Sequence, residues 1–194
     1  KKIVQCCMDT GGIDAVINLA GILNFSMFAG QDAALVSKIL EVNTLSPILL
    51  LQQLLPQLFL KPEARILNVG SIFGSIGHPG FAVYCASKAA IKTFSEALAR
   101  ELADTTVSVA YLAPRTTGTA LNNDKVRALN AALGNKEDSP ELVAKEICDM
   151  LSGKQSLRYM GWPEKLFVYI NAVMPSLVHK VLAGKLPLIK KFTH

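Results

Sequence analysis

The sequence is poor in the residues that build metal sites and disulfide frameworks. Its 194 residues include only four cysteines and three histidines. No two cysteines form a C-x-x-C pair, and no histidine stands at the spacing of a zinc ligand. The adjacent Cys6 and Cys7 are poor partners for one disulfide. These absences predict a protein without a metal site, whose thiols are reduced as in the cytoplasm.

The chain also lacks internal repeats, low-complexity tracts and a stripe of basic residues. Charged residues make up 18% of the chain and apolar residues 51%, and the formal net charge is +5. Basic residues are scattered apart from a C-terminal cluster, so no nucleic-acid partner is expected. This composition is typical of a folded domain with a sizeable core and not of a disordered chain.

What the sequence does contain is an alternation of short apolar runs with helical patterns. Apolar runs at residues 14–19, 64–69 and 107–112 suit buried parallel strands. Helices are expected at residues 1–8, 31–60 (in two stretches), 83–102, 122–133 and 140–150. Strands that alternate with helices predict an α/β fold built on a doubly wound parallel sheet.

Tyr84 and Lys88 carry the clearest chemical signal. Residues four apart lie on one face of a helix, which places the phenol beside the ammonium. A free phenol has a pKa of about 10, and a neighbouring positive charge lowers that pKa toward neutrality. The pair is therefore predicted to donate and accept a proton, although the same spacing also occurs on helices without any chemistry. Ser71 ends an apolar run, where its hydroxyl can hold a substrate oxygen beside the phenol.

Four short motifs follow one another in a set order. They are Asn18-Leu19-Ala20-Gly21, Glu41-Val42-Asn43-Thr44 at the opening of a helix, Arg65 to Ser71, and Tyr84-x-x-x-Lys88. In this order and spacing, the chain from about Ile13 to Thr119 resembles the short-chain dehydrogenase/reductase family, in its single-domain branch. The resemblance implies a Rossmann-like doubly wound parallel sheet and an oxidoreductase that uses NAD or NADP.

The resemblance also implies a catalytic tetrad. Tyr84 matches the general acid/base, and Lys88 matches the lysine that tunes the phenol and holds the nicotinamide ribose. Ser71 matches the residue that hydrogen-bonds the reacting oxygen, and Asn43 the residue that positions a water in a proton relay. The implied reaction transfers hydride between the nicotinamide and a carbonyl or secondary alcohol. The implied cofactor-binding residues are Asn18, Ala20, Gly21, Tyr84, Lys88, Pro114, Thr117 and Thr119.

The beginning of the chain departs from the family pattern. The family opens its nucleotide site with Thr-Gly-x-x-x-Gly-x-Gly, whose glycines let the backbone approach the pyrophosphate. Only Gly11 and Gly12 precede the first motif, so neither that loop nor the first strands can be found here. An N-terminally truncated fragment is expected, and the alternative is a shortened protein that has lost nucleotide binding. Gly70, Gly74 and Gly77 have the wrong spacing for a phosphate loop and are assigned to the strand-to-active-site loop.

The loop after the third apolar run carries one departure from the family. Arg115 stands where the family usually has glycine. Two interpretations are open: a guanidinium near the site that favours an anionic substrate or cofactor phosphate, or an ordinary surface arginine. Substrate choice is expected to lie in residues 122–133. The pocket is expected to be largely apolar, lined by Phe73, Ile76, Phe81 and the apolar tail.

Residues 1–160 are predicted to form the catalytic part, and residues 161–194 an extension that is both apolar and basic. No apolar run in the extension approaches the roughly 20 residues that span a bilayer. Four roles remain open for it: a lid over an apolar substrate, a subunit contact, a helix on an anionic membrane surface, and plain core.

The leading prediction is a cytoplasmic NAD(P)-dependent oxidoreductase with an apolar carbonyl or alcohol substrate. A homodimer or homotetramer is expected through the long helices that hold residues 49–58 and 91–102, and the extension would account for any membrane-surface contact. A sugar-nucleotide epimerase or dehydratase of the family's longer branch shares the Tyr-x-x-x-Lys motif, but it is disfavoured because that branch normally carries a larger C-terminal substrate domain, which is not found here. A non-catalytic dimerisation or scaffold module is the alternative of another class, and cofactor binding separates it from the enzyme. The residues that choose NAD or NADP normally lie before the first motif.

Overall fold

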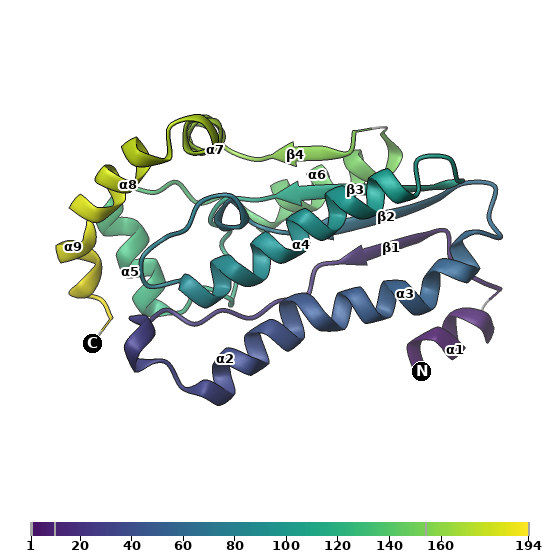
Figure 1. The fold of residues 1–194 in the computed structure, drawn as a ribbon, viewed down its shortest axis with the longest axis horizontal. Coiled ribbons are helices and arrows are strands. Elements are labelled where there is room, and N and C mark those ends of the chain that lie inside the picture. Colours follow the sequence, from purple (N-terminus) through teal and green to yellow (C-terminus); the bar gives the residue numbers. More distant parts are fainter. Residues whose placement is uncertain (1, 10, 154, 194) are drawn as a thin grey trace.

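The computed structural model describes residues 2–9, 11–153 and 155–193. Four strands form one parallel sheet in the order β1-β2-β3-β4 (Figure 1). The strands are β1 (Ala15–Asn18), β2 (Ala64–Val69), β3 (Val107–Ala113) and β4 (Leu157–Tyr159). Asn18 pairs with Asn68 and Val69 with Leu112, so the carboxyl ends of the strands meet at one edge. The predicted α/β parallel sheet is confirmed.

Helices cover both faces of the sheet, which explains why the strands read as continuous apolar runs. On one face, α3 (Ser46–Leu58) and α4 (Ala82–Glu101) pack on side chains such as Ile66 and Val109. On the other face, α6 (Pro140–Ser152) packs on their neighbours Leu67 and Ala110. Successive strand residues point to opposite faces, and each finds an apolar layer. The short α1 (Lys2–Asp9) packs beside α3 (Figure 1).

The two helical stretches expected within residues 31–60 are present, and they are joined into one continuous rod over residues 33–58. It consists of α2 (Ala33–Leu40), a π-helical turn (Glu41–Leu45) and α3. The prediction that Glu41 to Thr44 opens a new helix is wrong, because the Ser46 amide bonds back to the Glu41 carbonyl and the coil continues. By length and mean hydropathy of 1.5 this rod could span a membrane. Only 17% of its apolar window is buried, and the buried side packs leucines of α3 such as Leu51 and Leu58 against the sheet.

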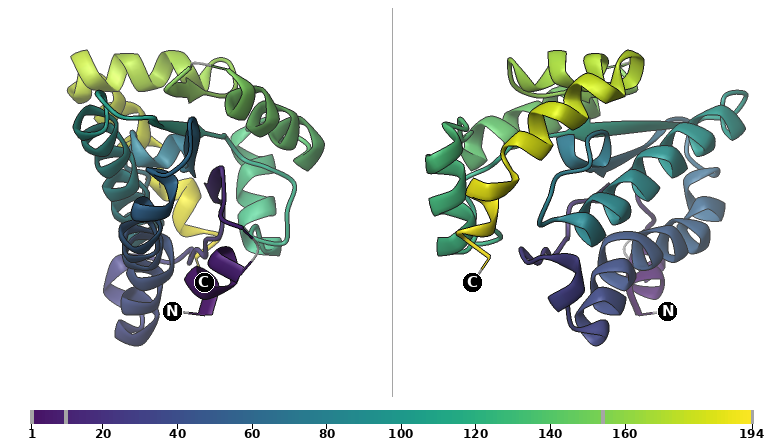
Figure 2. Two further views of the ribbon diagram at one scale, coloured as in Figure 1. Left: turned by 90° about the vertical axis from the view of Figure 1, so that its right-hand side faces the viewer. Right: turned by 60° about the vertical axis from the view of Figure 1, so that its left-hand side comes forward.

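The C-terminal third adds one strand and one face-covering helix to the sheet, and its other helices lie near the carboxyl ends of the strands (Figure 1). It contains α5 (Asp124–Leu133), α6, β4, α7 (Glu164–Val173), α8 (Pro175–Gly184) and α9 (Leu186–Lys190). The expected cap of α6 is observed, since Ser139 Oγ accepts the Leu142 amide at 3.2 Å. The three-residue β4 was not predicted. Figure 2 shows α7, α8 and α9 descending in sequence along one side of the molecule.

The extension is packed on the rest of the chain and is not a free tail. Val168 of α7 and Val178 of α8 join the cluster that contains Tyr111 of β3. Ile189 of α9 is fully buried in a second cluster with Tyr84 of α4. Each of the three C-terminal helices therefore has one side packed against the sheet-containing part of the chain.

Candidate active site

The carboxyl edge of the sheet brings the predicted tetrad together. Ser71 lies two residues after the end of β2, and Tyr84 and Lys88 lie in the first two turns of α4. The chain returns from the strand to α4 through the turn at Gly80, whose φ of +84° is a conformation that favours glycine. Tyr84 is 7% exposed and Lys88 only 5%, so both polar groups are inside the protein.

Burial sets the acidity of Tyr84. Its pKa is raised to about 12, mainly because burial penalises the phenolate, and a hydrogen bond with the Ser71 side chain only partly opposes the shift. The lowered phenol pKa expected from the sequence is therefore wrong for the chain as it stands. The apolar surroundings of the ring outweigh the charge of the lysine, and the phenol stays protonated at neutral pH.

Lys88 is held beside the phenol, and it has no acidic partner among the residues that the structure describes. Its Nζ lies 5.8 Å from the centroid of the Tyr84 ring and donates to the Val69 carbonyl at 3.3 Å. Burial lowers the lysine pKa to about 8. Since an ammonium has three N–H donors, Lys88 can still offer hydrogen bonds to a bound group.

Asn43 lies in the π-helical turn of the rod, a distortion that is frequent at functional sites. Its Oδ1 accepts the Ile22 amide and its Nδ2 donates to the Ile22 carbonyl, both at 2.8 Å. A third bond joins Nδ2 to Ser87 Oγ at 3.0 Å. The amide therefore has one fixed orientation. It is also near Lys88, since a Cβ added at Gly21 would lie 3.4 Å from Asn43 Oδ1 and 3.3 Å from Lys88 Nζ.

Ser71 is oriented by a tyrosine that sequence reasoning missed. The Ser71 Oγ accepts a hydrogen bond from the Phe73 amide at 3.1 Å, and this bond caps the short 3-10 helix Ile72–Gly74. The Tyr111 hydroxyl accepts the Ser71 amide at 3.3 Å and lies 3.4 Å from the Ser71 carbonyl. A buried tyrosine in a strand resembles ordinary core, so only the glycines that Tyr111 touches could have indicated its role.

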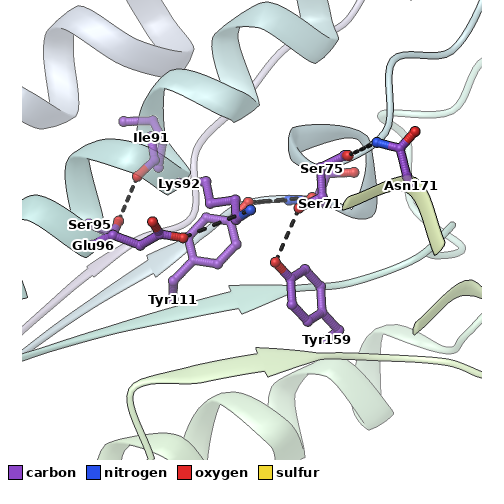
Figure 3. A network of polar contacts seen from close by, with 9 residues as sticks. All are labelled: Ser71, Ser75, Ile91, Lys92, Ser95, Glu96, Tyr111, Tyr159 and Asn171. Carbon is purple, nitrogen blue, oxygen red and sulfur yellow. Dashed lines mark hydrogen bonds and ion pairs between the residues drawn. The ribbon is translucent and has the colours of Figure 1, made fainter. Parts of the chain in front are cut away.

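The turn that carries Ser71 is held from further sides. Tyr159 Oη lies 3.2 Å from Ser75 Oγ, and Asn171 Nδ2 donates to the Ser75 carbonyl at 2.9 Å. Figure 3 shows Tyr111 and Tyr159 approaching the turn from adjacent strands, with Asn171 on its other side. Residues from β3, β4 and α7 thus fix the backbone next to Ser71.

The predicted cofactor residues at the end of β1 have mixed surroundings. Asn18 donates to Asn68 Oδ1 at 2.7 Å, and Asn68 donates to Ser95 Oγ at 2.8 Å. These two hydrogen bonds link β1 through β2 to α4, so the Asn18 side chain has a structural role. Ala20 is exposed, and Gly21 lies against Lys88 and Asn43.

The loop after β3 connects only partly to the tetrad. The Pro114 carbonyl accepts the Ile72 amide at 3.0 Å, next to Ser71. Thr117 Oγ1 donates to the Arg115 carbonyl at 3.1 Å, and Thr119 is exposed. Among the described residues, Thr117 and Thr119 form hydrogen bonds only with other residues of this loop, and Thr117 also pairs with Asp138. Neither threonine bonds a residue of the predicted tetrad.

Arg115 has neither of the roles considered from the sequence. Its Nη2 lies 2.6 Å from Asp138 Oδ1 and its Nη1 lies 3.4 Å from Glu164 Oε2. The guanidinium is thus neutralised by two carboxylates and joins the loop after β3 to the starts of α6 and α7. The nearby cavity of about 270 Å³ contains no residue of the tetrad; it is lined by Arg115, Asp138, Leu142, Glu146, Arg158, Tyr159, Met160 and Gly161.

We expect Arg115→Met to destabilise the protein by about 2–3 kcal/mol, because it leaves the buried Asp138 carboxylate without its cation. Urea unfolding would measure the change. Arg127→Met is the matched control, because its pair with Asp124 is exposed and such pairs contribute about 0–1 kcal/mol. Equal losses in the two variants would contradict a structural role for the Arg115 cluster.

An apolar wall surrounds the phenol of Tyr84. It comes from the segment before α2, the start of α4, α5 and α9, and consists of Phe25, Phe81, Cys85, Val126, Leu129 and Ile189. Phe73 packs edge-on against Tyr84 with ring centroids 6.4 Å apart. Phe73 and Phe81 thus lie where expected. Ile76 does not, because it packs against Tyr111 in a different cluster.

We expect Lys88→Met to raise the free energy of unfolding by about 2–3 kcal/mol near pH 7, because a buried ammonium is removed. The folded pKa of about 8 lies below the ordinary lysine pKa of 10.5, so the unfolded chain binds more protons between these values. Stability of the unmodified protein should therefore rise with pH across that window, and the advantage of the variant should shrink.

Thermal unfolding at several pH values between neutrality and pH 10.5 would measure this difference. Lys136→Met, at an exposed position, serves as the control and should not change stability at any pH. A pH-independent difference for Lys88→Met would show that packing, and not the buried charge, causes it.

Known proteins resemble this chain in both sequence and fold. The family model described as short chain dehydrogenase matches residues 1–130. Nodulation protein G of Rhizobium meliloti (strain 1021) is 37% identical over 106 residues, which cover 55% of this chain and 43% of the relative. The Bos taurus protein named dehydrogenase/reductase SDR family member 7B is 26% identical over 201 residues, which cover 100% of this chain and 61% of the relative. The chain thus spans about half the length of the curated relatives it matches.

Solved structures share the arrangement of the sheet and helices. A short chain dehydrogenase from Burkholderia cenocepacia J2315, in complex with NADP, superposes with a TM-score of 0.80 at 21% identity. The match covers 93% of this chain and 75% of that structure. A relative from Burkholderia phymatum, in complex with NAD, gives a TM-score of 0.76 at 19% identity over 90% of this chain and 72% of that structure. At these identities, the likeness concerns the fold alone.

Proposed function

Because this chain belongs to the short-chain dehydrogenase family, we propose that it catalyses the NAD(P)-dependent interconversion of a carbonyl and a secondary alcohol. The observation that carries the proposal is the convergence of Ser71, Tyr84, Lys88 and Asn43 at one edge of the sheet. They come from three separate segments, and buried hydrogen bonds orient Asn43 and Lys88. A buried phenol and a buried ammonium without a carboxylate partner destabilise a fold, so their presence favours a chemical role.

The residues present fit the ribose and nicotinamide end of the cofactor. Gly21 leaves open the space beside Lys88 and Asn43 that a side chain would fill, and Lys88 has donors for ribose hydroxyls. Relatives of the same fold in complex with NADP and NAD support a nicotinamide cofactor. When bound, that cofactor supplies or accepts the hydride, and the chemistry of hydride transfer belongs to it.

Tyr84 is proposed as the group that exchanges a proton with the substrate oxygen. Burial keeps the phenol protonated at neutral pH, so the chain is prepared to donate a proton during reduction. Ser71 would hold the same oxygen and stabilise the negative charge that develops on it. Lys88 would stabilise the phenolate that remains after the proton leaves, and Asn43, which is fixed near Lys88, would position a water in a proton relay to the lysine.

The substrate is proposed to be an apolar carbonyl compound or alcohol. The wall around Tyr84 is built from aromatic and aliphatic side chains, among them Phe25, Phe81 and Leu129. Ile189 closes this wall from α9 and is fully buried. A substrate that reaches Tyr84 must displace or adjoin these side chains, which favours a substituent without charge.

Exposed leucines along the rod support the proposed pairing of two subunits. Leu40, Leu45 and Leu49 are each more than 40% exposed, although they belong to a helix whose opposite side is core. A homodimer through this rod and α4 would cover them. This association is compatible both with the enzyme and with a non-catalytic scaffold module, so it does not distinguish the two.

Titration of the chain with NADH and NADPH, followed by cofactor fluorescence, tests the proposal. Saturable binding that Gly21→Val abolishes would support the enzyme, because the valine side chain would occupy the space beside Lys88 and Asn43. Binding only by a longer form of the protein would place the remaining contacts before Lys1. No binding by any folded form would overturn the proposal and favour the scaffold module.

A further inference from the structure

The formal charge of this chain is concentrated at its C-terminal end. All 15 acidic residues, and 15 of the 20 basic residues, precede Lys165, so the first 164 residues are formally neutral. The last 30 residues hold five lysines and no aspartate or glutamate, and so carry the entire net charge of +5. All five lysines are exposed; they are Lys165, Lys180, Lys185, Lys190 and Lys191.

Two stripes of exposed apolar side chains run along the same segment. They consist of Leu166, Tyr169 and Val173 on α7, and of Met174, Leu177 and Val181 at the start of and along α8. In each stripe the residues are spaced i, i+3, i+7, which places them on one helix face. The stripes meet at the elbow between the two helices, where Val173 is 81% exposed and Met174 54%.

These side chains are exposed although the helices already have a core side. Val168 and Val178 are buried against the catalytic part, so the stripes lie on faces that the fold leaves open. Eight of the 21 exposed large apolar residues of the described chain fall between Trp162 and Val181. A concentration of this kind marks an interaction surface.

The positive charge around the two apolar stripes indicates which kind of partner this surface binds. A two-fold contact between copies of this chain would bring two identical tails together, each with five positive charges and no acidic residue to pair with them. An anionic lipid surface complements both features, since acyl chains accept the apolar stripes and headgroups accept the lysines. Helices of ten residues are too short to span a bilayer and can only lie along it.

We propose that α7, α8 and α9 form a docking surface for anionic membranes. The elbow at Val173 and Met174 enters the headgroup region, and the lysines contact the lipid phosphates and carboxylates. The stripes are exposed, whereas α9 meets Tyr84 through the buried Ile189, so the inference does not depend on the proposed reaction.

Trp162 allows the unmodified chain to be tested. It is the only tryptophan, it is 65% exposed, and it precedes α7 directly. Addition of phosphatidylcholine vesicles that contain phosphatidylserine should shift its emission to shorter wavelength and sediment the protein. Vesicles of phosphatidylcholine alone should do so weakly. Raising the salt from about 0.1 M to about 1 M should release the protein, because the Debye length falls from about 10 Å to about 3 Å.

Two double variants separate the apolar and the electrostatic contributions. Val173→Asp with Leu177→Asp should abolish sedimentation with anionic vesicles. Lys180→Glu with Lys191→Glu should weaken it at least about 25-fold, since each lysine near an anionic surface contributes about fivefold. Leu60→Glu and Lys136→Glu change equally exposed residues elsewhere and should leave vesicle binding unchanged.

Circular dichroism and thermal unfolding would show that each variant is folded. The proposal fails if the unmodified chain binds neutral and anionic vesicles equally or binds neither, as the tryptophan experiment shows without any substitution. It also fails if the Val173 and Leu177 substitutions convert a dimer to a monomer in light scattering, because the surface would then be a contact between copies.

Discussion

Replacement of Tyr84 by phenylalanine should reduce turnover by about 10²–10⁴-fold while the protein stays folded. The substitution removes only the hydroxyl, which is the proposed proton donor and the partner of the Ser71 side chain. The aromatic ring would still fill its place in the apolar wall with Phe81 and Ile189. Steady-state kinetics with the full-length protein would measure the effect.

Tyr169→Phe is the matched control for this variant. Tyr169 is half exposed on α7, and removal of its hydroxyl should leave turnover unchanged. Cofactor affinity should fall little in Tyr84→Phe, so the loss should occur in kcat. Turnover close to that of the unmodified protein would remove Tyr84 from the mechanism, and a loss confined to cofactor affinity would reassign it to binding.

A single methyl group at Gly70 should destabilise the fold by more than about 3 kcal/mol. A Cβ at this position would lie 2.0 Å from the Tyr111 hydroxyl and 2.2 Å from Tyr111 Cζ, inside a fully packed core. Tyr111 cannot yield easily, because its hydroxyl also bonds the backbone on both sides of Ser71. We therefore expect Gly70→Ala to lower the unfolding midpoint in urea and to displace Ser71.

Gly77→Ala is the control in the same loop. No atom lies within 4 Å of a Cβ at Gly77, and its φ is not positive. This variant should be neutral or stabilising by about 0.4–1 kcal/mol, because alanine restricts the unfolded chain. A double-mutant cycle of Gly70→Ala with Tyr111→Leu should show strong coupling, and additive effects would mean that Tyr111 is not the cause.

The direction of the Tyr84 pKa illustrates the limit of local reasoning. The spacing of Tyr84 and Lys88 places them together, and a structure was not needed to predict that. Whether the phenol is more or less acidic depends on the competition between the nearby charge and burial. Burial comes from α5 and α9, which lie 40 and 100 residues further along the chain, and it dominates.

Arg115 shows the same limit in another form. From the sequence, its guanidinium can be assigned to an anionic ligand or to solvent. Its actual partners, Asp138 and Glu164, are 23 and 49 residues away. Nothing in the local pattern of either acidic residue distinguishes it from a solvated one, so only the packing of α6 and α7 against the loop could reveal the cluster.

The sequence by itself determined the sheet, the long helices and the order of the tetrad. Strand β2 was predicted with its observed bounds, and α4 to within one residue, because buried strands leave continuous apolar runs and amphipathic helices leave a helical period. Only the tertiary structure decided the acidity of Tyr84, the partners of Arg115, the support of Ser71 by Tyr111, and the existence of β4. These depend on burial and on pairing between distant segments, and β4, with three residues, is too short to show a period.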